Sequence, residues 1–432
     1  MSTATPAIPT PPAPRERAAQ TPPLPTASSS PSPAARRLAS VCIVTINRPE
    51  GDTGVHTHTR MLASGLDAGG VRCDVVSAFD AGARWLPVFA VRPLLLKRIN
   101  STAATLWHRK WHMAALHGAL RRRIEAQLPD VIVAQCPVSA RAALDARDAT
   151  QTKPPVVLVC HFNHSEAAEY REKGELAGEV HYRDMLAFED RVLEEVDRVI
   201  YVSEWARQNV EDARGLRTKA SAVVWNGVDE SIPPPLTRAQ LNLRDDDLVL
   251  MNVGSLEPRK NQLGLLDLFA TIHSQHTAAR LVLVGDGPAR GDIEQKIAEM
   301  NLSDAVTLLG HRRDVEALLP LANLYVHYAA LENCPLALIE AARAGLAFAA
   351  VPAGGVPELQ RALDCGFELQ PHDLRASMDN IRPLLDHAHV RESAGKQACE
   401  RFKATFTRDA MAHAYIETLS TTAKYLGESG TK

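Results

Sequence analysis

The sequence has no C-x-x-C pair, no long apolar run and no strong excess of either charge. Its seven cysteines are scattered and odd in number, which argues against a disulfide framework or a zinc ribbon and favours a reducing compartment. No apolar stretch approaches the roughly 20 residues that a membrane-spanning helix needs. Because the N-terminus also lacks a basic segment followed by an apolar core, we expect a cytoplasmic protein.

The charge balance argues against a further class of partner. A formal net charge of −3 over 432 residues attracts no polyanion, so we do not expect nucleic acid as a partner. Hydrophobic residues make up 45% of the chain and charged residues 23%, which is ordinary for a soluble globular protein. The length predicts two or three domains.

Residues 1–37 consist almost entirely of Pro, Ala, Ser, Thr and Arg. Such a segment buries too little apolar surface to offset the entropy of ordering, so we predict a disordered tail. Short apolar runs then alternate with helical stretches, with few polar residues on either face of the runs. This pattern is typical of parallel strands covered by helices on both sides, and it predicts an α/β fold. The predicted strands are 41–47, 73–78, 131–136, 156–161, 198–203 and 221–225, followed by 248–255, 280–285, 306–310, 324–328 and 346–351.

The segment NGVDESIPPP, residues 226–235, separates the two series of strands. Asn-Gly and three prolines indicate a turn and a stiff linker. We therefore predict two doubly wound domains, at 38–220 and 221–400. Apolar residues at helical spacing near the end of the chain predict a final helix at 401–425.

Residues 81–124 contain nine Lys or Arg and no Asp or Glu, with Trp85, Phe89, Trp107 and Trp111 interleaved. Basic residues combined with Trp and Leu suit the surface of an anionic membrane. The alternative is a solvated basic helix with a few aromatic residues in the core. The composition alone leaves both interpretations open.

The segment ALENCPLALIEAARAG, residues 330–345, places two carboxylates on an otherwise apolar stretch. It follows a predicted strand, so it lies at the carboxyl end of the sheet, where open α/β folds bind ligands. Asn333 is suited to the N-cap of the next helix and Pro335 to its first turn. The free N–H groups of such a helix end favour an anion, with Glu332 and Glu340 beside it. The alternative is a capped helix whose Glu340 bonds a buried backbone group.

This spacing resembles the E-x7-E motif of the retaining glycosyltransferases of family four, which have the GT-B fold. Other stretches fall in the family's order, from about residue 41 to the final helix. They are PEGDTGVHTHTRMLASGLDAGG (49–70), VVLVCHFNH (156–164), VDRVIYVSEW (196–205), VVWNGVDES (223–231), MNVGSLEPRKNQLGLL (251–266), LVLVGDGP (281–288) and AAVPAGGVPEL (349–359). The resemblance implies two Rossmann-like domains facing a cleft, with the final helix crossing back to the first domain.

The resemblance also implies residues for the donor phosphates. Lys260 would contact the diphosphate, and Gly254 belongs to the same strand-to-loop segment. The family carries an arginine where this chain has Ser255, so a bidentate phosphate clamp is missing, and Arg259 is the adjacent candidate to replace it. Gly54 matches the second glycine of the loop in the acceptor domain, where a glycine lets the backbone approach a phosphate closely.

For the sugar and the ribose, the family pattern implies that Glu332 bonds hydroxyls of the donor sugar and Glu340 bonds the nucleotide ribose. His161, at the end of the fourth strand, would lie near the transferred sugar. Backbone N–H groups would hold sugar or phosphate at Asn333, Cys334 and Leu336.

The activity implied by the resemblance is transfer of a hexose, with retention, from a nucleotide diphosphate sugar to a glycan or lipid-linked acceptor in cell-surface polysaccharide synthesis. The leaving phosphate itself would take the acceptor's proton, so no protein nucleophile is needed. Neither a metal nor a cofactor is implied, because the nucleotide sugar is a co-substrate. The protein would be cytoplasmic or peripheral on the inner face of the cell membrane.

Three other functions fit parts of the sequence. Ser255 keeps open a sensor that binds a nucleotide sugar without turning it over. HTH at 56–58 and HFNH at 161–164, with Glu166, predict a metal-dependent hydrolase, although neither spacing matches a common ligand motif. GDGPARG at 285–291 suggests a nicotinamide oxidoreductase, but its glycine spacing differs from the dinucleotide fingerprint.

Overall fold

The computed structural model describes residues 38–48, 50–51, 53–91, 96 and 99–429. The tail predicted for residues 1–37 lies outside these residues. The described chain folds into two sheets, and each contains only parallel strand pairs, as predicted.

The first sheet has the strand order β2-β1-β3-β4-β5-β6 and the second the order β12-β11-β10-β7-β8-β9. Every strand predicted from the sequence is present within a few residues of its expected ends. The two-residue β12 was not predicted, because two residues carry no periodic signal. The strands are β1 (Ser40–Thr45), β2 (Arg72–Ser77), β3 (Val131–Ala134), β4 (Val156–Cys160), β5 (Arg198–Tyr201), β6 (Ser221–Val223), β7 (Leu248–Val253), β8 (Ala279–Val284), β9 (Val306–Gly310), β10 (Leu324–His327), β11 (Phe348–Ala350) and β12 (Phe367–Glu368).

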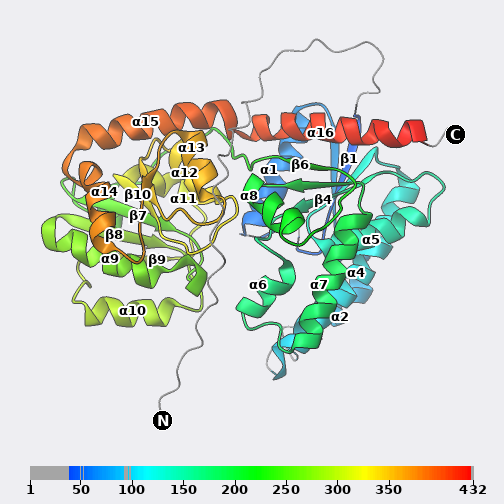
Figure 1. The fold of residues 1–432 in the computed structure, drawn as a ribbon, viewed down its shortest axis with the longest axis horizontal. Coiled ribbons are helices and arrows are strands. Elements are labelled where there is room, and N and C mark those ends of the chain that lie inside the picture. Colours follow the sequence, from blue (N-terminus) through cyan, green and yellow to red (C-terminus); the bar gives the residue numbers. More distant parts are fainter. Residues whose placement is uncertain (1–37, 49, 52, 92–95, 97–98, 430–432) are drawn as a thin grey trace. The chain divides into compact units, whose positions relative to one another are not determined.

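Helices connect successive strands and cover the faces of the sheets (Figure 1). The α-helices are α1 (Gly54–Ala68), α2 (Leu86–Val91), α4 (Ser101–Ala126), α5 (Pro137–Asp148), α6 (Glu166–Glu172), α7 (Glu179–Glu195), α8 (Glu204–Arg207), α9 (Gln262–Gln275), α10 (Arg290–Glu299), α11 (Val315–Leu318), α12 (Leu336–Arg343), α13 (Val356–Leu363), α14 (Leu374–Asp386), α15 (Ala388–Thr405) and α16 (Arg408–Ser429). Shorter helical turns are η1 (Ala78–Ala81), η2 (Ala83–Trp85), η4 (Gln208–Asp212), η5 (Arg238–Leu241), η6 (Pro258–Lys260) and η7 (Leu319–Leu321).

Both faces of the sheets are buried, which explains the unbroken apolar runs. In β1, Val41 and Ile43 pack into one core cluster, and the alternating Cys42 and Val44 pack into another. All four side chains are at most 2% exposed. Successive residues of a strand point to opposite faces, so a strand with two covered faces needs apolar residues at every position.

In each sheet, the strands that follow the first one in sequence are added on one side of it and then on the other. The place where the side changes is the topological switch point. In the first sheet β1 lies between β2 and β3, and in the second β7 lies between β8 and β10. Loops that leave the carboxyl ends of these neighbouring strands diverge to opposite faces, and open α/β sheets bind ligands at this point. The second switch point is therefore flanked by the loop after β7 and the loop after β10.

The predicted boundary at residue 220 falls just before β6. That strand pairs with β5, with Val199 opposite Ser221, so it belongs to the first sheet. The first sheet thus continues beyond the boundary that the sequence suggested, and the linker NGVDESIPPP follows it directly.

The single final helix predicted at 401–425 is instead two helices, α15 and α16, separated at Phe406 and Thr407. The break is held by the interdomain linker. Val228 N–H donates to the Phe406 carbonyl at 3.0 Å, and Arg408 N–H donates to the Val228 carbonyl at 2.7 Å. A Cβ on Gly227 would lie 2.3 Å from the Thr407 carbonyl oxygen, so only glycine permits this approach.

Helix α16 returns to the first sheet, as the resemblance implied, and runs along α1 (Figure 1). The two helices approach closely at Gly65 of α1 and at Gly69, the residue that caps its C-terminus. A Cβ on Gly65 would lie 2.7 Å from the Cβ of Ala412, and one on Gly69 would lie 2.7 Å from Cδ1 of Ile416. Small residues at a helix contact allow such close backbone approach.

The basic and aromatic stretch at 81–124 is largely engaged within the fold. Trp85 and Phe89 pack against the core of the first sheet, and Trp107 Nε1 donates to a backbone carbonyl at 3.1 Å. Arg109 is buried in an ion pair with Glu166 at 2.6 Å. The exposed large apolar side chains in the described part of this stretch are Leu86, Ile99 and Leu106. Arg92, Lys97 and Arg98 lie outside the described residues, and membrane contact stays a prediction.

No helix within the described residues combines the length and the apolar character needed to cross a bilayer.

We expect Gly65→Ala to lower the free energy of unfolding by about 1–3 kcal/mol, because the added methyl group overpacks the contact with Ala412. Gly118→Ala is the matched control, since it also lies within a helix and its added Cβ would meet only Nη1 of Arg122, at 3.9 Å. There the change should raise stability by up to about 1 kcal/mol through helix propensity. Urea unfolding followed by circular dichroism measures both. Equal effects of the two substitutions would contradict the tight packing of α16 on α1.

Candidate functional site

The loop after β7 brings two cations to the second switch point. Gly254 follows the strand directly, and the turn η6 carries Arg259 and Lys260. The Lys260 side chain lies over Gly254, because a Cβ added there would be 3.7 Å from Lys260 Cε. A Cβ on Gly285 would lie 1.9 Å from the Gly254 carbonyl oxygen, so the ends of β7 and β8 pack backbone to backbone. A Cβ on Gly287 would lie 2.4 Å from the Leu256 carbonyl oxygen, so Gly285 and Gly287 of GDGPARG serve close packing, whereas a Cβ on Gly291 would meet no described atom within 4 Å.

The loop after β10 carries Glu332 and Asn333 and leads into α12. The N-cap of α12 is Pro335, so the expectation that Asn333 caps this helix is wrong. The Asn333 side chain instead reaches residues of the first sheet domain. Its Oδ1 accepts from Ser203 Oγ, and its Nδ2 donates to the Phe162 carbonyl at 3.1 Å. The Asn333 side chain thus bonds partners that are distant in the sequence and does not cap α12.

The start of α12 offers unpaired backbone donors. Within the described residues, the N–H groups of Asn333, Cys334, Leu336 and Ala337 make no hydrogen bond. They belong to the loop and to the first turn, where an α-helix has no internal partners for its N–H groups. Together with the helix dipole, such groups form a site suited to a phosphate or another anion.

Glu332 is 7% exposed and lies among basic groups. Its Oε1 pairs with Lys260 Nζ, and its Oε2 accepts from Arg259 Nη1 at 3.3 Å. Arg259 Nη1 also donates to the Leu331 carbonyl at 3.0 Å, which fixes the guanidinium. Burial raises the pKa of Glu332, but Lys260, His327 and Arg259 outweigh it and hold the pKa below its usual value. The carboxylate is therefore ionised at neutral pH.

Glu340 has the opposite electrostatic setting. Burial raises its pKa to about 7, and Glu316 adds to this while Arg343 and Arg60 oppose it. Its carboxylate makes no hydrogen bond or ion pair to any described residue, so the alternative in which it bonds a buried backbone group is wrong. Burial raises the pKa of Tyr325, in β10, and Glu340 and Glu332 raise it further.

His161 follows β4 and lies in a buried polar network of the first domain. Its Nε2 lies 2.9 Å from Gln135 Oε1, and its ring packs edge-on against His58, with centroids 4.7 Å apart. Burial and the neighbouring His58 hold the pKa of His161 well below its usual value, so the imidazole is neutral. A neutral imidazole can donate one hydrogen bond and accept another, which suits contact with a sugar hydroxyl.

Hydrogen bonds of Asn226 connect this network with the start of α12. Asn226 Oδ1 lies 2.9 Å from His58 Nδ1, and Asn226 Nδ2 donates to the Cys334 carbonyl at 3.1 Å. Gly54 begins α1, and a Cβ added there would lie 3.8 Å from Leu336 Cδ1. The structure therefore brings Gly54, His161 and the α12 start together.

For Ser255 the structure shows hydrogen bonds of the backbone: its carbonyl accepts from Gln262 Nε2 and from the Glu257 N–H, both at 3.0 Å. A role for its side chain toward phosphate stays a prediction.

The four histidines considered for a metal site do not gather. His56 is half-buried and bonds Thr53, whereas His164 is exposed and packs against Trp205. Within the described residues, no group of three His, Cys, Asp or Glu side chains is arranged to hold a metal ion. Only His58 and His161 are neighbours, and both are engaged in the network described above.

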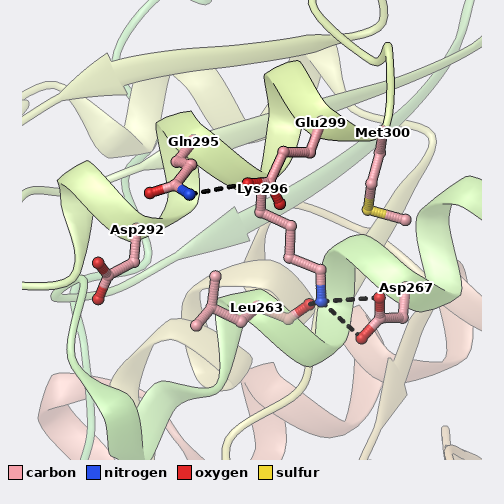
Figure 2. Close-up of a pocket in the computed structure, with 7 residues that line it drawn as sticks. All are labelled: Leu263, Asp267, Asp292, Gln295, Lys296, Glu299 and Met300. Atoms are coloured by element: carbon pink, nitrogen blue, oxygen red, sulfur yellow. Dashed lines mark hydrogen bonds and ion pairs between the residues drawn. The ribbon is translucent and has the colours of Figure 1, made fainter.

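A cavity of about 370 Å³ lies elsewhere, on the surface between α9 and α10 (Figure 2). Lys296 extends across it and bonds both Asp267, at 2.7 Å, and the Leu263 carbonyl, at 3.0 Å. Gln295 donates to Glu299 at 2.7 Å, and none of the predicted site residues lines the cavity.

Three contributors were missed by the sequence reasoning: His327, Asn226 and Ser203. A histidine ending the apolar run LYVH was a usable signal for His327, because a polar residue in a buried strand calls for an explanation. Asn226 was interpreted only as part of a turn. Ser203 carried no signal, since its partner Asn333 is 130 residues away.

Two family models match consecutive parts of the chain. The model described as Glycosyltransferase Family 4 matches residues 53–232, and the model described as Glycosyl transferases group 1 matches residues 235–401. Among curated relatives, the N-acetyl-alpha-D-glucosaminyl L-malate synthase of Bacillus anthracis is 26% identical over 44% of this chain and 51% of its own length. The phosphatidylinositol N-acetylglucosaminyltransferase gpi3 subunit of Schizosaccharomyces pombe is 31% identical over 42% of this chain and 39% of its own length. The chain thus spans about half or less of these relatives.

Solved structures share the fold over most of the chain. Sucrose-phosphate synthase from Thermosynechococcus elongatus superposes with a TM-score of 0.69 at 21% identity, covering 88% of this chain and 98% of that protein. The Anabaena protein HepE in complex with UDP-glucose gives a TM-score of 0.66 at 18% identity, covering 88% and 99%. These likenesses confirm the two-sheet GT-B fold; the cleft expected between its domains stays a prediction.

Glu340 should make stability depend on pH. Its pKa is raised on folding, so the native state holds a proton that the unfolded state releases between about pH 4.5 and pH 7. Stability should therefore fall as pH rises through this window. Glu340→Gln removes the ionisation and should be more stable than the parent by roughly 1–3 kcal/mol at pH 8, with the difference shrinking toward pH 5. Urea unfolding at the two pH values measures this.

The control for this prediction is Glu417→Gln, in the exposed part of α16, which should change stability little at either pH. A Glu340→Gln effect of the same size at pH 5 and pH 8 would contradict the elevated pKa.

Proposed function

Because this chain belongs to the family 4, group 1 glycosyltransferases, whose models cover residues 53–232 and 235–401, we propose that it transfers a hexose from a uridine diphosphate sugar with retention at the anomeric carbon. The single observation that carries the proposal is the arrangement at the second switch point. There, unpaired N–H groups at the start of α12 stand beside a buried Glu332–Lys260 pair and an unpaired Glu340.

Each part of a nucleotide sugar has a suitable partner in this arrangement. The N–H groups of Asn333, Cys334 and Leu336 and the Lys260 ammonium suit the diphosphate. Glu340, which lacks a partner in the described residues, is free to accept from ribose hydroxyls. Glu332 is held ionised and can accept from hydroxyls of the sugar. Arg259 is not free to replace the missing arginine at Ser255, because it is tied to Glu332 and to the Leu331 carbonyl.

The reaction needs charge stabilisation at the leaving diphosphate more than it needs a nucleophile. As the bond to the anomeric carbon breaks, negative charge grows on the phosphate oxygens. Preorganised N–H groups and a lysine stabilise that charge most strongly in the transition state. The leaving phosphate takes the acceptor's proton, which places the acceptor on the same face of the sugar and gives retention. The neutral His161 would orient the sugar. Neither a metal nor a further cofactor is part of this proposal.

The choice of uridine diphosphate sugars is supported by the relatives. HepE was crystallised with UDP-glucose, and two curated relatives are named for N-acetylglucosamine transfer. A third relative is a Vi polysaccharide biosynthesis protein of Salmonella typhi. We therefore propose UDP-glucose or UDP-N-acetylglucosamine as donor and a glycan or lipid-linked acceptor of cell-surface polysaccharide synthesis. Exposed Leu86, Ile99 and Leu106 near basic residues support peripheral contact with an anionic membrane surface.

The proposal is tested by thermal shift with UDP, UDP-glucose and UDP-N-acetylglucosamine, followed by assay of donor hydrolysis and sugar transfer. A ligand that binds the native state raises its stability as RT ln(1 + [L]/Kd). We expect a shift with UDP and a larger one with the true donor, and turnover that persists in EDTA. Binding without any turnover would instead support a nucleotide-sugar sensor, and the lack of any shift would contradict both functions.

Substitutions of Glu340 and Glu332 should have different effects on binding and on turnover. Glu340→Ala should raise the Kd for UDP about tenfold, because it removes a hydrogen-bond acceptor for the ribose. Glu332→Ala should lower kcat about 100-fold with a smaller effect on UDP binding, because it acts on the sugar. Calorimetry and steady-state kinetics measure these quantities. Glu417→Ala, in the exposed part of α16, is the control and should match the parent. Transfer at the parent rate by both variants would show that the assigned roles are wrong.

A further inference from the structure

His327 is a buried polar residue that the proposed chemistry does not use. It ends β10, directly before the loop that carries Glu332, and it is 2% exposed. Its ring stacks on Tyr325 of the same strand face, with centroids 6.3 Å apart. Burial lowers the pKa of His327 to about 4, against the opposing effect of Glu332, so the ring is neutral at physiological pH.

Neither ring nitrogen of His327 makes a hydrogen bond to any residue that the structure describes. A buried polar atom without a partner costs on the order of 1–3 kcal/mol, so such atoms are rare unless another state of the protein uses them. Nε2 lies 3.6 Å from Oε1 of Glu332, just beyond hydrogen-bond distance. A shift of less than about 1 Å would bring them into contact.

The two carboxylate oxygens of Glu332 have different partners. Oε2 accepts from Arg259, which is itself fixed on the Leu331 carbonyl. Oε1 faces both Lys260 Nζ, which pairs with it, and His327 Nε2. Lys260 is also the residue suited to the donor diphosphate. When phosphate oxygens take all the hydrogen bonds of its ammonium group, Lys260 no longer donates to Oε1. Arg259 stays on Oε2, but Oε1 would then be a buried acceptor without a donor, which costs on the order of 1–3 kcal/mol.

We propose that His327 is a positioning residue that holds Glu332 during turnover: when Lys260 moves from Oε1 to the donor diphosphate, the Nε2–H of His327 donates to Oε1 in its place. This inference rests on the proposed function, because it assigns the diphosphate to Lys260. The hydrogen bond keeps the carboxylate ionised and aimed at the sugar hydroxyls.

A neutral imidazole suits this role better than a second cation. A lysine or arginine at position 327 would compete with Lys260 for Glu332 or for the phosphate. An apolar residue would leave Oε1 with no donor once Lys260 has turned. Imidazole supplies one N–H without adding charge, provided that the proton sits on Nε2.

Three substitutions separate this role from simple packing. His327→Gln places an amide N–H near the position of Nε2, His327→Asn places one near Nδ1, and His327→Leu keeps bulk without a donor. The probes are UDP, UDP-glucose and UDP-N-acetylglucosamine. Calorimetry gives Kd values, kinetics give kcat and KM, and thermal unfolding without ligand reports the stability of each variant.

We expect UDP to bind His327→Gln within about threefold of the parent and to bind His327→Leu and His327→Asn roughly tenfold more weakly, because in those two variants Oε1 has no donor once Lys260 moves to the diphosphate. His327→Leu should lower kcat at least tenfold and reduce the extra affinity of the UDP-sugar over UDP, as expected for loss of a hydrogen bond to a charged group. His327→Gln should recover most of the rate, and His327→Asn should not.

Equal kcat in the parent and His327→Leu would overturn the inference while leaving the proposed function standing. So would equal recovery by His327→Gln and His327→Asn, because this would show that the amide position is irrelevant. If His327→Leu does not fold, the comparison of the Gln and Asn variants alone decides. Failure of the parent protein to bind any of the three probes would contradict the proposed function, and the inference with it.

Discussion

A carboxylate buried between basic groups organises the candidate site. Glu332 is held by Lys260 and Arg259, both supplied by the turn after β7, and is faced by His327 at the end of β10. An ionised carboxylate in a buried position is tolerated only when charge and hydrogen bonds compensate for its lost hydration. The pair therefore fixes the loop after β10 against the loop after β7. In doing so it sets the position of the first turn of α12, whose N–H groups lie directly beyond Asn333.

The parallel sheet makes this pairing possible. β7 and β10 are neighbours in space although more than 70 residues separate Lys260 from Glu332. Their loops emerge at the same edge because both strands run in the same direction, and they diverge because the chain reverses its order of strands between them. The glycines at 254 and 285 let the strand ends approach backbone to backbone, which leaves room for the Lys260 side chain above Gly254. The switch in strand order thus determines where the two loops of the candidate site lie.

Much of the fold could be predicted from the sequence, because strands with two buried faces are unbroken apolar runs, and proline and glycine mark the linker. The loops at the second switch point could also be placed, since each follows such a run. The contacts within them could not. Asn333 is a favourable N-cap by local rules, yet its side chain bonds Ser203 and Phe162, which lie far away in the sequence. The ion pair of Lys260 with Glu332 is equally non-local.

The remaining differences have similar causes. The break between α15 and α16 depends on the linker residues Gly227 and Val228, which pack against Thr407 and Phe406. No pattern within residues 401–425 reveals such a contact. His327 could be noticed in the sequence as a polar residue in an apolar strand. Its role could be inferred only from the structure, in which its ring nitrogens lack partners among the described residues and Nε2 lies near Glu332.

We propose that Lys260 exchanges Glu332 for the donor diphosphate. A double-mutant cycle of Lys260→Met and Glu332→Gln, measured by urea unfolding with and without saturating UDP, reports the coupling energy of the two side chains in each state. The account predicts a clear coupling in the absence of UDP that falls toward zero when UDP is bound. A coupling energy that UDP leaves unchanged would contradict it.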